Sequence, residues 1–185
     1  EPSIDVLGVP FFVMEQVPGR VPPDIPPYVF GGWLLDATPE SQLQLQEFCV
    51  GIIAQLHQIK QKSPVTDFLE FRTQGETALK RHFTNQKEYY RWVTQDNRQH
   101  PVIEQAFDWL ESHWPEESET VVSWGDARIG NIMFDNKALE PVAVLDWEMA
   151  GLAPVEVDLG WMIVIFLIDI FFFSVSYLFI YVFVS

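Results

Sequence analysis

The sequence contains the stretch Ser123-Trp-Gly-Asp-Ala-Arg-Ile-Gly-Asn131, in which one aspartate, Asp126, precedes one asparagine, Asn131, by five positions. A short apolar run follows at residues 142–145, and a second aspartate, Asp146, comes directly after it. This layout is typical of a phosphoryl-transfer site, where one carboxylate accepts the proton of the attacking hydroxyl while an asparagine and a second aspartate hold magnesium ions. The pattern therefore predicts that these three side chains meet at one point.

The same residues also have a plainer interpretation. Gly-Asp is a common turn, and Asn131 could simply cap or bridge a loop. Two further acids, Glu148 and Asp158, follow Asp146 and favour the phosphoryl-transfer interpretation. A metal-dependent hydrolase that uses the same carboxylates is the main competing class of enzyme.

Hydrophobic periodicity and helix-start signals predict four helices. Thr38 suits an N-cap and Pro39 suits the first helical position, and apolar residues then recur at three-and-four spacing. The expected helices cover residues 38–60, 76–95, 100–114 and 155 onward, and the third of them should bury an apolar stripe. We expect His57, near the end of the first helix, to be bonded to a nearby loop and not to act as a ligand.

Short β-branched and apolar runs predict strands around the polar loop. The expected strands cover residues 10–15, 120–123, 132–134 and 142–145. Residues 151–154 should form a turn, because they combine Gly and Pro. Residues 20–36 contain four prolines and should form a surface loop.

The segment Met14-Glu-Gln-Val17 reads as a strand that becomes a Pro-Gly turn. In a nucleotide-binding protein such a hinge offers backbone C=O and N–H groups to an adenine edge. The backbone of Glu15 and Val17 would then face the base, with Met14 beside it. Taken alone, the segment favours an ordinary strand and turn over this nucleotide-binding interpretation.

The formal net charge of −15 over 185 residues excludes a broad basic surface. Nucleic acid and anionic membrane surfaces are therefore not expected as partners. An anionic nucleotide would have to be held by local features and metal ions. The single cysteine, Cys49, rules out a disulfide framework or a cysteine-based zinc site within one chain.

Three motifs together resemble the aminoglycoside phosphotransferase family. They are Trp124-Gly-Asp-Ala-Arg-Ile-Gly-Asn131, Val144-Leu-Asp-Trp-Glu148 and Glu156-Val-Asp-Leu-Gly160. The resemblance covers roughly residues 7–162 and is greatest to the small-molecule phosphotransferases related to the kinase-like domains fused to acyl-CoA dehydrogenases. It implies a protein-kinase-like fold, a cytoplasmic location and ATP- and Mg2+-dependent phosphorylation of a small-molecule hydroxyl.

The resemblance also assigns roles residue by residue. Asp126 would be the catalytic base, Asn131 and Asp146 the magnesium ligands, and Glu148 an acid that assists the metal. Residues 14–17 would be the adenine-binding hinge, and Asp158 would brace the catalytic loop. Trp124 stands where the family usually has histidine, a position that orients the loop and performs no chemistry.

The start of the chain departs from the family pattern. The family's N-terminal lobe, with its phosphate-covering loop and ATP-binding lysine, should precede the hinge, and nothing before Met14 supplies either feature. The expected fold class is therefore α+β: a protein-kinase-like C-terminal lobe, mostly helical with short strands around the catalytic loop, and an N-terminal lobe largely missing. The expected parts are 1–19 (lobe end and hinge), 20–160 (catalytic lobe) and 161–185 (hydrophobic tail). A non-catalytic remnant, tethered to a membrane through this tail, is the alternative to an enzyme.

Residues 161–184 form an almost wholly apolar segment with Asp169 as its only charge. Twenty-four residues are enough to span a bilayer, but no Lys or Arg follows Lys137 to anchor an orientation. Asp169 would also be costly in lipid. Three interpretations stay open: a membrane-spanning helix, sequence that is not native to the family, and a buried helix of a larger assembly.

Overall fold

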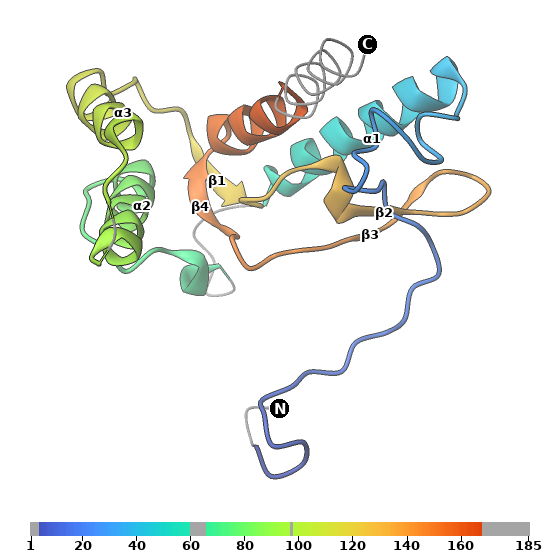
Figure 1. The fold of residues 1–185 in the computed structure, drawn as a ribbon, viewed down its shortest axis with the longest axis horizontal. Helices are drawn as coiled ribbons and strands as arrows, with labels where there is room; N and C mark the ends of the chain where they lie inside the picture. The colour runs from blue at the N-terminus through green and yellow to red at the C-terminus, as the bar shows by residue number, and fades with distance from the viewer. Residues whose placement is uncertain (1–3, 60–65, 97, 168–185) are drawn as a thin grey trace, which may run out of the picture.

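The computed structural model describes residues 4–59, 66–96 and 98–167, and Figure 1 shows their arrangement. The described elements are α1 (Pro39–Leu56), α2 (Ala78–Thr94), α3 (Pro101–Ser112), β1 (Thr120–Ser123), β2 (Ile132–Phe134), β3 (Pro141–Val144) and β4 (Gly151–Pro154). Short 3-10 turns lie at Asp67–Leu69 and Ile129–Asn131, and residues 156–167 are helical up to the end of the described part of the chain. In Figure 1, α2 and α3 lie together at one end of the molecule and α1 lies toward the other, with the short strands between them.

Helix α1 begins where its capping signals predict. The Thr38 hydroxyl accepts a hydrogen bond from the Ser41 backbone N–H at 3.3 Å, and Pro39 occupies the first turn. Its buried residues recur at intervals of three and four: Leu45, Cys49, Ile53 and Leu56. They share one hydrophobic cluster with residues at both ends of the 123–131 stretch, among them Val122, Trp124 and Ile132. Burying each large side chain contributes roughly 1.5–3 kcal/mol, so the two ends of that stretch are anchored to the core.

The strands form two antiparallel pairs. β1 pairs with β4, and β2 pairs with β3 through Ile132 opposite Val144. The three strands predicted between residues 120 and 145 are confirmed, because each coincides with β1, β2 or β3 within one residue. β1 ends and β2 begins on either side of the polar loop, which fixes both ends of that loop.

The predicted turn at residues 151–154 is wrong, because these residues form the buried strand β4. Pro154 lies opposite Thr120 at the end of the pairing, where a missing N–H is tolerated. Gly151 is needed for space, since a Cβ there would lie 2.9 Å from the Phe71 ring. Gly151 is therefore explained by close packing, and Pro154 by its place at the end of a strand.

Helices α2 and α3 pack on each other through aromatic rings. The Phe107 ring of α3 lies 5.5 Å from Phe83 and 5.7 Å from Tyr90 of α2. The prediction that α3 buries an apolar stripe is wrong, since none of its residues is buried and Val102 is 79% exposed. Phe107 contacts α2, whereas the other apolar positions of α3 stay at least one-third exposed, among them Ile103, Trp109 and Leu110.

The predicted strand at residues 10–15 is also wrong, because these residues have no regular secondary structure. Phe12, Val13 and Met14 are at least two-thirds exposed, and Figure 1 shows this segment running away from the body. A strand needs a hydrogen-bonded neighbour, and none of the described residues pairs with this segment. Regular contact begins at Arg20, whose backbone exchanges hydrogen bonds of 2.9 and 2.8 Å with Phe134.

The last described helix crosses the predicted boundary between residues 160 and 161 without a break. Met162 of this helix packs against the core cluster. Among the described helices, none has both the length and the apolar character that a membrane crossing requires. Residues 168–184 of the predicted hydrophobic segment lie outside the described residues, so the three interpretations of that segment stay predictions.

Candidate active site

The loop after β1 is held by one buried carboxylate, that of Asp158 in helix 156–167. The backbone N–H groups of Trp124 and Gly125 donate to it at 2.9 Å each. The Ser123 hydroxyl donates at 2.8 Å, and the His57 imidazole Nε2 lies 2.9 Å from Oδ2. Asp158 is therefore placed as the bracing acid that the resemblance implies, and His57 is bonded to the last helix.

Gly125 makes the turn that presents Asp126. Its φ of +86° lies in the left-handed region. A Cβ at this position would lie only 2.2 Å from the Met149 backbone oxygen. Only glycine therefore allows the loop to pass this close to the chain segment that carries Glu148.

Trp124 joins this loop to the end of β3. Its buried indole Nε1 donates to the Leu145 carbonyl at 2.9 Å and to the Asp146 carbonyl at 3.2 Å. The two predicted site segments, around Asp126 and around Asp146, are therefore linked by one side chain. The orienting role that the resemblance implies for Trp124 stays a prediction, and these two bonds are the contacts through which it would act.

The Asp126 carboxylate accepts three hydrogen bonds from the described residues. Oδ2 accepts from Asn131 Nδ2 at 2.7 Å and from Arg128 Nε at 3.2 Å. Oδ1 accepts from the indole Nε1 of Trp161 at 2.6 Å. Asn131 is buried, and its Nδ2 also donates to the Asp126 carbonyl at 3.1 Å. The predicted pair Asp126 and Asn131 is brought into direct contact, which leaves Asn131 Oδ1 as the amide atom suited to a cation.

Arg128 ties the loop to the proline-rich segment. Its Nη1 donates to Asp24 Oδ1 at 2.8 Å while Nε donates to Asp126. Burial alone would lower the pKa of Arg128, but the hydrogen bonds and charges of Asp24 and Asp126 outweigh it and raise that pKa overall. Arg128 is therefore a fixed cation beside the candidate base.

The carboxylates of Asp146 and Glu148 lie near each other on the exposed side of the loop. A hydrogen bond to Asp146, then its negative charge, raise the pKa of Glu148, with smaller effects from burial and from the charge of Asp126. Asp146 has a φ of +63°, which is uncommon for a residue other than glycine. Three acids thus influence one another electrostatically at this corner.

No three His, Cys, Asp or Glu side chains within the described ranges lie close enough together to hold a metal ion by themselves. The predicted metal set is different in kind, because it combines the amide of Asn131 with Asp146 and Glu148. Magnesium is usually bound by one or two carboxylates and by phosphate oxygens of the substrate. The predicted magnesium set therefore stays a prediction.

The predicted adenine-binding residues lie apart from this network. Met14 and Glu15 are exposed, and Val17 is partly buried. In the part of the chain that the structure describes, no hydrogen bond connects these three residues to the loop. Their role in nucleotide binding also stays a prediction.

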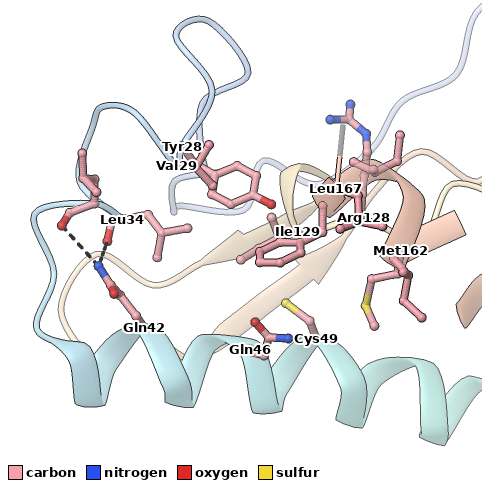
Figure 2. Close-up of a pocket in the computed structure, with 14 residues that line it drawn as sticks. Tyr28, Val29, Leu34, Gln42, Gln46, Cys49, Arg128, Ile129, Met162 and Leu167 are labelled. Carbon is pink, nitrogen blue, oxygen red and sulfur yellow. Dashed lines mark hydrogen bonds between the residues drawn. The ribbon is translucent and has the colours of Figure 1, made fainter. Parts of the chain in front are cut away.

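A cavity of about 370 Å³ lies beside Arg128, between residues 28–35, α1 and the last helix. Figure 2 shows its lining, in which Gln42 donates hydrogen bonds to the Leu34 and Leu35 carbonyls at 3.0 and 3.2 Å. Burial raises the pKa of Cys49 to about 12, so this lining thiol stays protonated and is no nucleophile. A second cavity, of about 450 Å³, lies between α2, α3 and residues 154–157.

Reasoning from sequence missed the contacts of Asp24, Trp161 and Arg128, and it expected His57 to be bonded to a nearby loop instead of to Asp158. Asp24 lies 104 positions from Arg128, His57 lies 101 from Asp158, and Trp161 lies 35 from Asp126. Local patterns carry no signal for such distant contacts. Arg128 differs from the other three, because it lies in the 123–131 stretch itself. Its charge, two positions after Asp126, was a local signal for a contact between these two side chains.

The sequence that builds this loop matches a family model over most of its length. The model of the family described as "phosphotransferase enzyme family" matches residues 3–173. The chain belongs to the phosphotransferase enzyme family. The resemblance carried by the acidic motifs is thereby confirmed.

Relatives of this phosphotransferase-family chain include two acyl-CoA dehydrogenase family members. Family member 10 of Mus musculus is 26% identical over 156 residues, covering 84% of this chain and 14% of the relative. Family member 11 of Homo sapiens is 30% identical over 157 residues, covering 84% of this chain and 18% of the relative. The chain therefore spans less than a fifth of the length of these relatives.

Solved structures share the fold of this phosphotransferase-family chain. A protein from Ralstonia eutropha, proposed to be an aminoglycoside phosphotransferase, is similar with a TM-score of 0.66 and 25% identity, over 87% of this chain and 46% of that one. A type VIII aminoglycoside-3'-phosphotransferase is similar with a TM-score of 0.56 and 18% identity, over 80% of this chain and 50% of that one. At this low identity, the similarity shows the fold alone. The predicted fold class, helices with short strands in a kinase-like lobe, is confirmed.

Proposed function

We propose that this chain carries the catalytic loop of an ATP- and Mg2+-dependent phosphotransferase that acts on the hydroxyl of a small molecule. The position of Asp126 carries the proposal. Its carboxylate is bonded to Asn131 at 2.7 Å in a loop that the buried Asp158 holds by two backbone N–H groups. Membership of the phosphotransferase family supports the same reaction class.

Asp126 is the proposed base. The acceptor oxygen attacks the terminal phosphorus of ATP, the bond from that phosphorus to the ADP oxygen breaks, and the hydroxyl proton passes to the Asp126 carboxylate. Hydrogen bonds from Asn131 and Arg128 hold one carboxylate oxygen in place. Such positioning contributes much of the rate in reactions where the protein does little covalent chemistry.

The proposed magnesium ligands are Asn131 Oδ1, Asp146 and Glu148. Glu148 shares a hydrogen bond with Asp146, and that bond, then the charge of Asp146, raises the pKa of Glu148, so two carboxylates lie next to each other at this corner. Carboxylate and amide oxygens are the donors that magnesium prefers. A bound ion would neutralise the charge that develops on the phosphate oxygens during transfer.

The proposed adenine site is the backbone of Met14, Glu15 and Val17. This segment has no regular secondary structure, and Met14 is 68% exposed, which leaves its peptide groups accessible to a planar base. The net charge of −15 argues that the phosphates bind through the metal and local donors, not through a basic surface.

The test is ADP release by the full-length protein from ATP and Mg2+ with a panel of small alcohols, amino sugars among them. Asp126→Asn keeps the shape of the side chain but removes its capacity to accept the proton. We expect kcat to fall by about 100-fold or more. Asp135→Asn is the matched control, because the Asp135 carboxylate accepts bonds from the backbone N–H groups of Lys137 and Ala138 within its own turn.

Unchanged kcat in Asp126→Asn would contradict the assignment of the base. No ADP release and no nucleotide binding by the wild-type protein would instead favour the alternative, a non-catalytic member of the fold.

A further inference from the structure

One face of helix 156–167 contacts three consecutive residues of the catalytic loop. Asp158 accepts from the backbone N–H groups of Trp124 and Gly125. Trp161, three positions later, donates to the side chain of Asp126. Residues three apart lie on the same face of a helix, so one turn of this helix holds both the loop backbone and the candidate base.

The two oxygens of Asp126 are held from different directions. Asn131 and Arg128 both bind Oδ2, and both belong to the loop itself. These bonds restrain the terminal torsion of Asp126, which has a broad, two-fold preference in aspartate, but they leave Oδ1 without a donor from the loop. The bond from Trp161 to Oδ1 comes from outside the loop and adds a second, opposed restraint on the plane of the carboxylate.

Packing alone does not explain the position of Trp161. The residue is 37% exposed, whereas Trp124 in the core is 1% exposed. Its indole Nε1 reaches 2.6 Å from Oδ1, well within hydrogen-bond distance. An indole is a donor only and is uncharged, so it orients the carboxylate without forming an ion pair.

We propose that Trp161 is a positioning residue for the reaction, which sets the plane of the Asp126 carboxylate so that Oδ1 faces the acceptor hydroxyl. This inference rests on the proposed function, and it adds a residue that none of the three acidic motifs contains. A carboxylate has about four lone-pair sites. The described donors use two at Oδ2 and one at Oδ1, so the remaining site, on Oδ1, is the one left for the acceptor proton.

The contact itself is tested without any activity, by 1H–15N spectra of the tryptophan indoles of the full-length protein. The signal of Trp161 is assigned by its loss in Trp161→Phe. Asp126→Ala removes the acceptor, so the Trp161 signal should move upfield and its proton should exchange faster with water. The other indole signals report whether the fold is kept. A Trp161 signal that does not respond to Asp126→Ala would overturn the inference.

The positioning role is tested by the kinetics of Trp161→Phe, with ADP release measured from ATP, Mg2+ and an acceptor on which the wild type is active. We expect kcat to fall about tenfold or more while the KM values for ATP and acceptor change little, because the ground-state contacts are kept. Trp109→Phe is the matched control, since Trp109 lies on α3, is 58% exposed and stacks on His113.

The outcomes separate this inference from the proposed function. A wild type that releases no ADP with any acceptor refutes the proposed function and the positioning role of Trp161 together. An active wild type with full kcat in Trp161→Phe refutes the positioning role alone. A rise in KM without a fall in kcat also refutes it, because Trp161 would then contribute to ground-state binding instead.

Discussion

Asp158 shows how a single buried charge can organise a site. Its side chain is fully buried, and a carboxylate in such a place is costly unless hydrogen bonds compensate its charge. Two backbone N–H groups, the Ser123 hydroxyl and the His57 imidazole surround it. The same bonds satisfy the backbone of the turn, so the loop and the charge stabilise each other.

We predict that Asp158→Asn destabilises the protein by about 3 kcal/mol. The amide replaces one acceptor oxygen with an NH2 group, which faces donors instead of acceptors. Urea unfolding followed by circular dichroism measures the change in the free energy of unfolding. Glu156→Gln is the control two positions away: Glu156 is exposed and accepts one bond from Ser118, so its loss should change the free energy of unfolding by less than about 0.5 kcal/mol. Equal effects in the two variants would contradict the bracing role.

At the residue scale, the sequence was informative where the chemistry is local. Asp126 and Asn131 are five positions apart, and the structure brings them into contact. Asp146 follows fifteen positions after Asn131, and Trp124 links it to the loop. Contacts between residues 35 to 104 positions apart produce no recognisable spacing in the sequence. The partners that were missed come from such distant segments: Asp24, His57 and Trp161.

At the scale of elements, the loop depends on one glycine. Gly125 combines a φ of +86° with a space in which a Cβ would lie 2.2 Å from a backbone oxygen. Gly160, in helix 156–167, offers the opposite case, because a Cβ there would meet nothing within 4 Å. The two glycines form a matched pair for the same substitution.

We expect Gly125→Ala to destabilise the protein by about 2 kcal/mol or more, because the left-handed backbone and the clash both oppose a side chain. Gly160→Ala should instead stabilise it by about 0.5–1 kcal/mol through helix propensity. Thermal unfolding of both variants against the wild type gives the two signs. A stabilising Gly125→Ala would show that the turn is not built as described.

Helices were easier to predict than strands, for a physical reason. Helix starts depend on local signals, such as Thr38 before α1 and the Pro101 that opens α3, and both helices begin there. A strand depends on a partner elsewhere in the chain. Residues 10–15 carry the right composition but have no pairing neighbour among the described residues, whereas residues 151–154 look like a turn and pair with β1.

At the scale of the whole molecule, the site lies where separate parts meet. The core cluster joins α1 to the residues that flank the loop, among them Trp124 and Ile132. Helix 156–167 adds Asp158 and Trp161, and the proline-rich segment adds Asp24 through Arg128. The fold class was predictable because the acidic motifs together resemble the family that the match over residues 3–173 confirms. The exposed face of α3 was not, because burial depends on how the helices are placed in space.

The negative net charge of the molecule opposes the binding of an anionic nucleotide. With a net charge of −15, the chain repels ATP unless a cation lies between the phosphates and the acidic corner. Binding of ATP should therefore depend on magnesium, and on the amide of Asn131 as well as on the carboxylates.

The most direct test of this account is a calorimetric titration of the full-length protein with ATP at saturating Mg2+. We predict binding that is lost without Mg2+ and lost in Asn131→Ala, but kept in Asn136→Ala, since Asn136 lies exposed in the turn after β2. ATP binding that persists in a folded Asn131→Ala variant, or that is the same with and without Mg2+, would contradict the central claim that Asp126, Asn131 and Asp146 form a phosphoryl-transfer site.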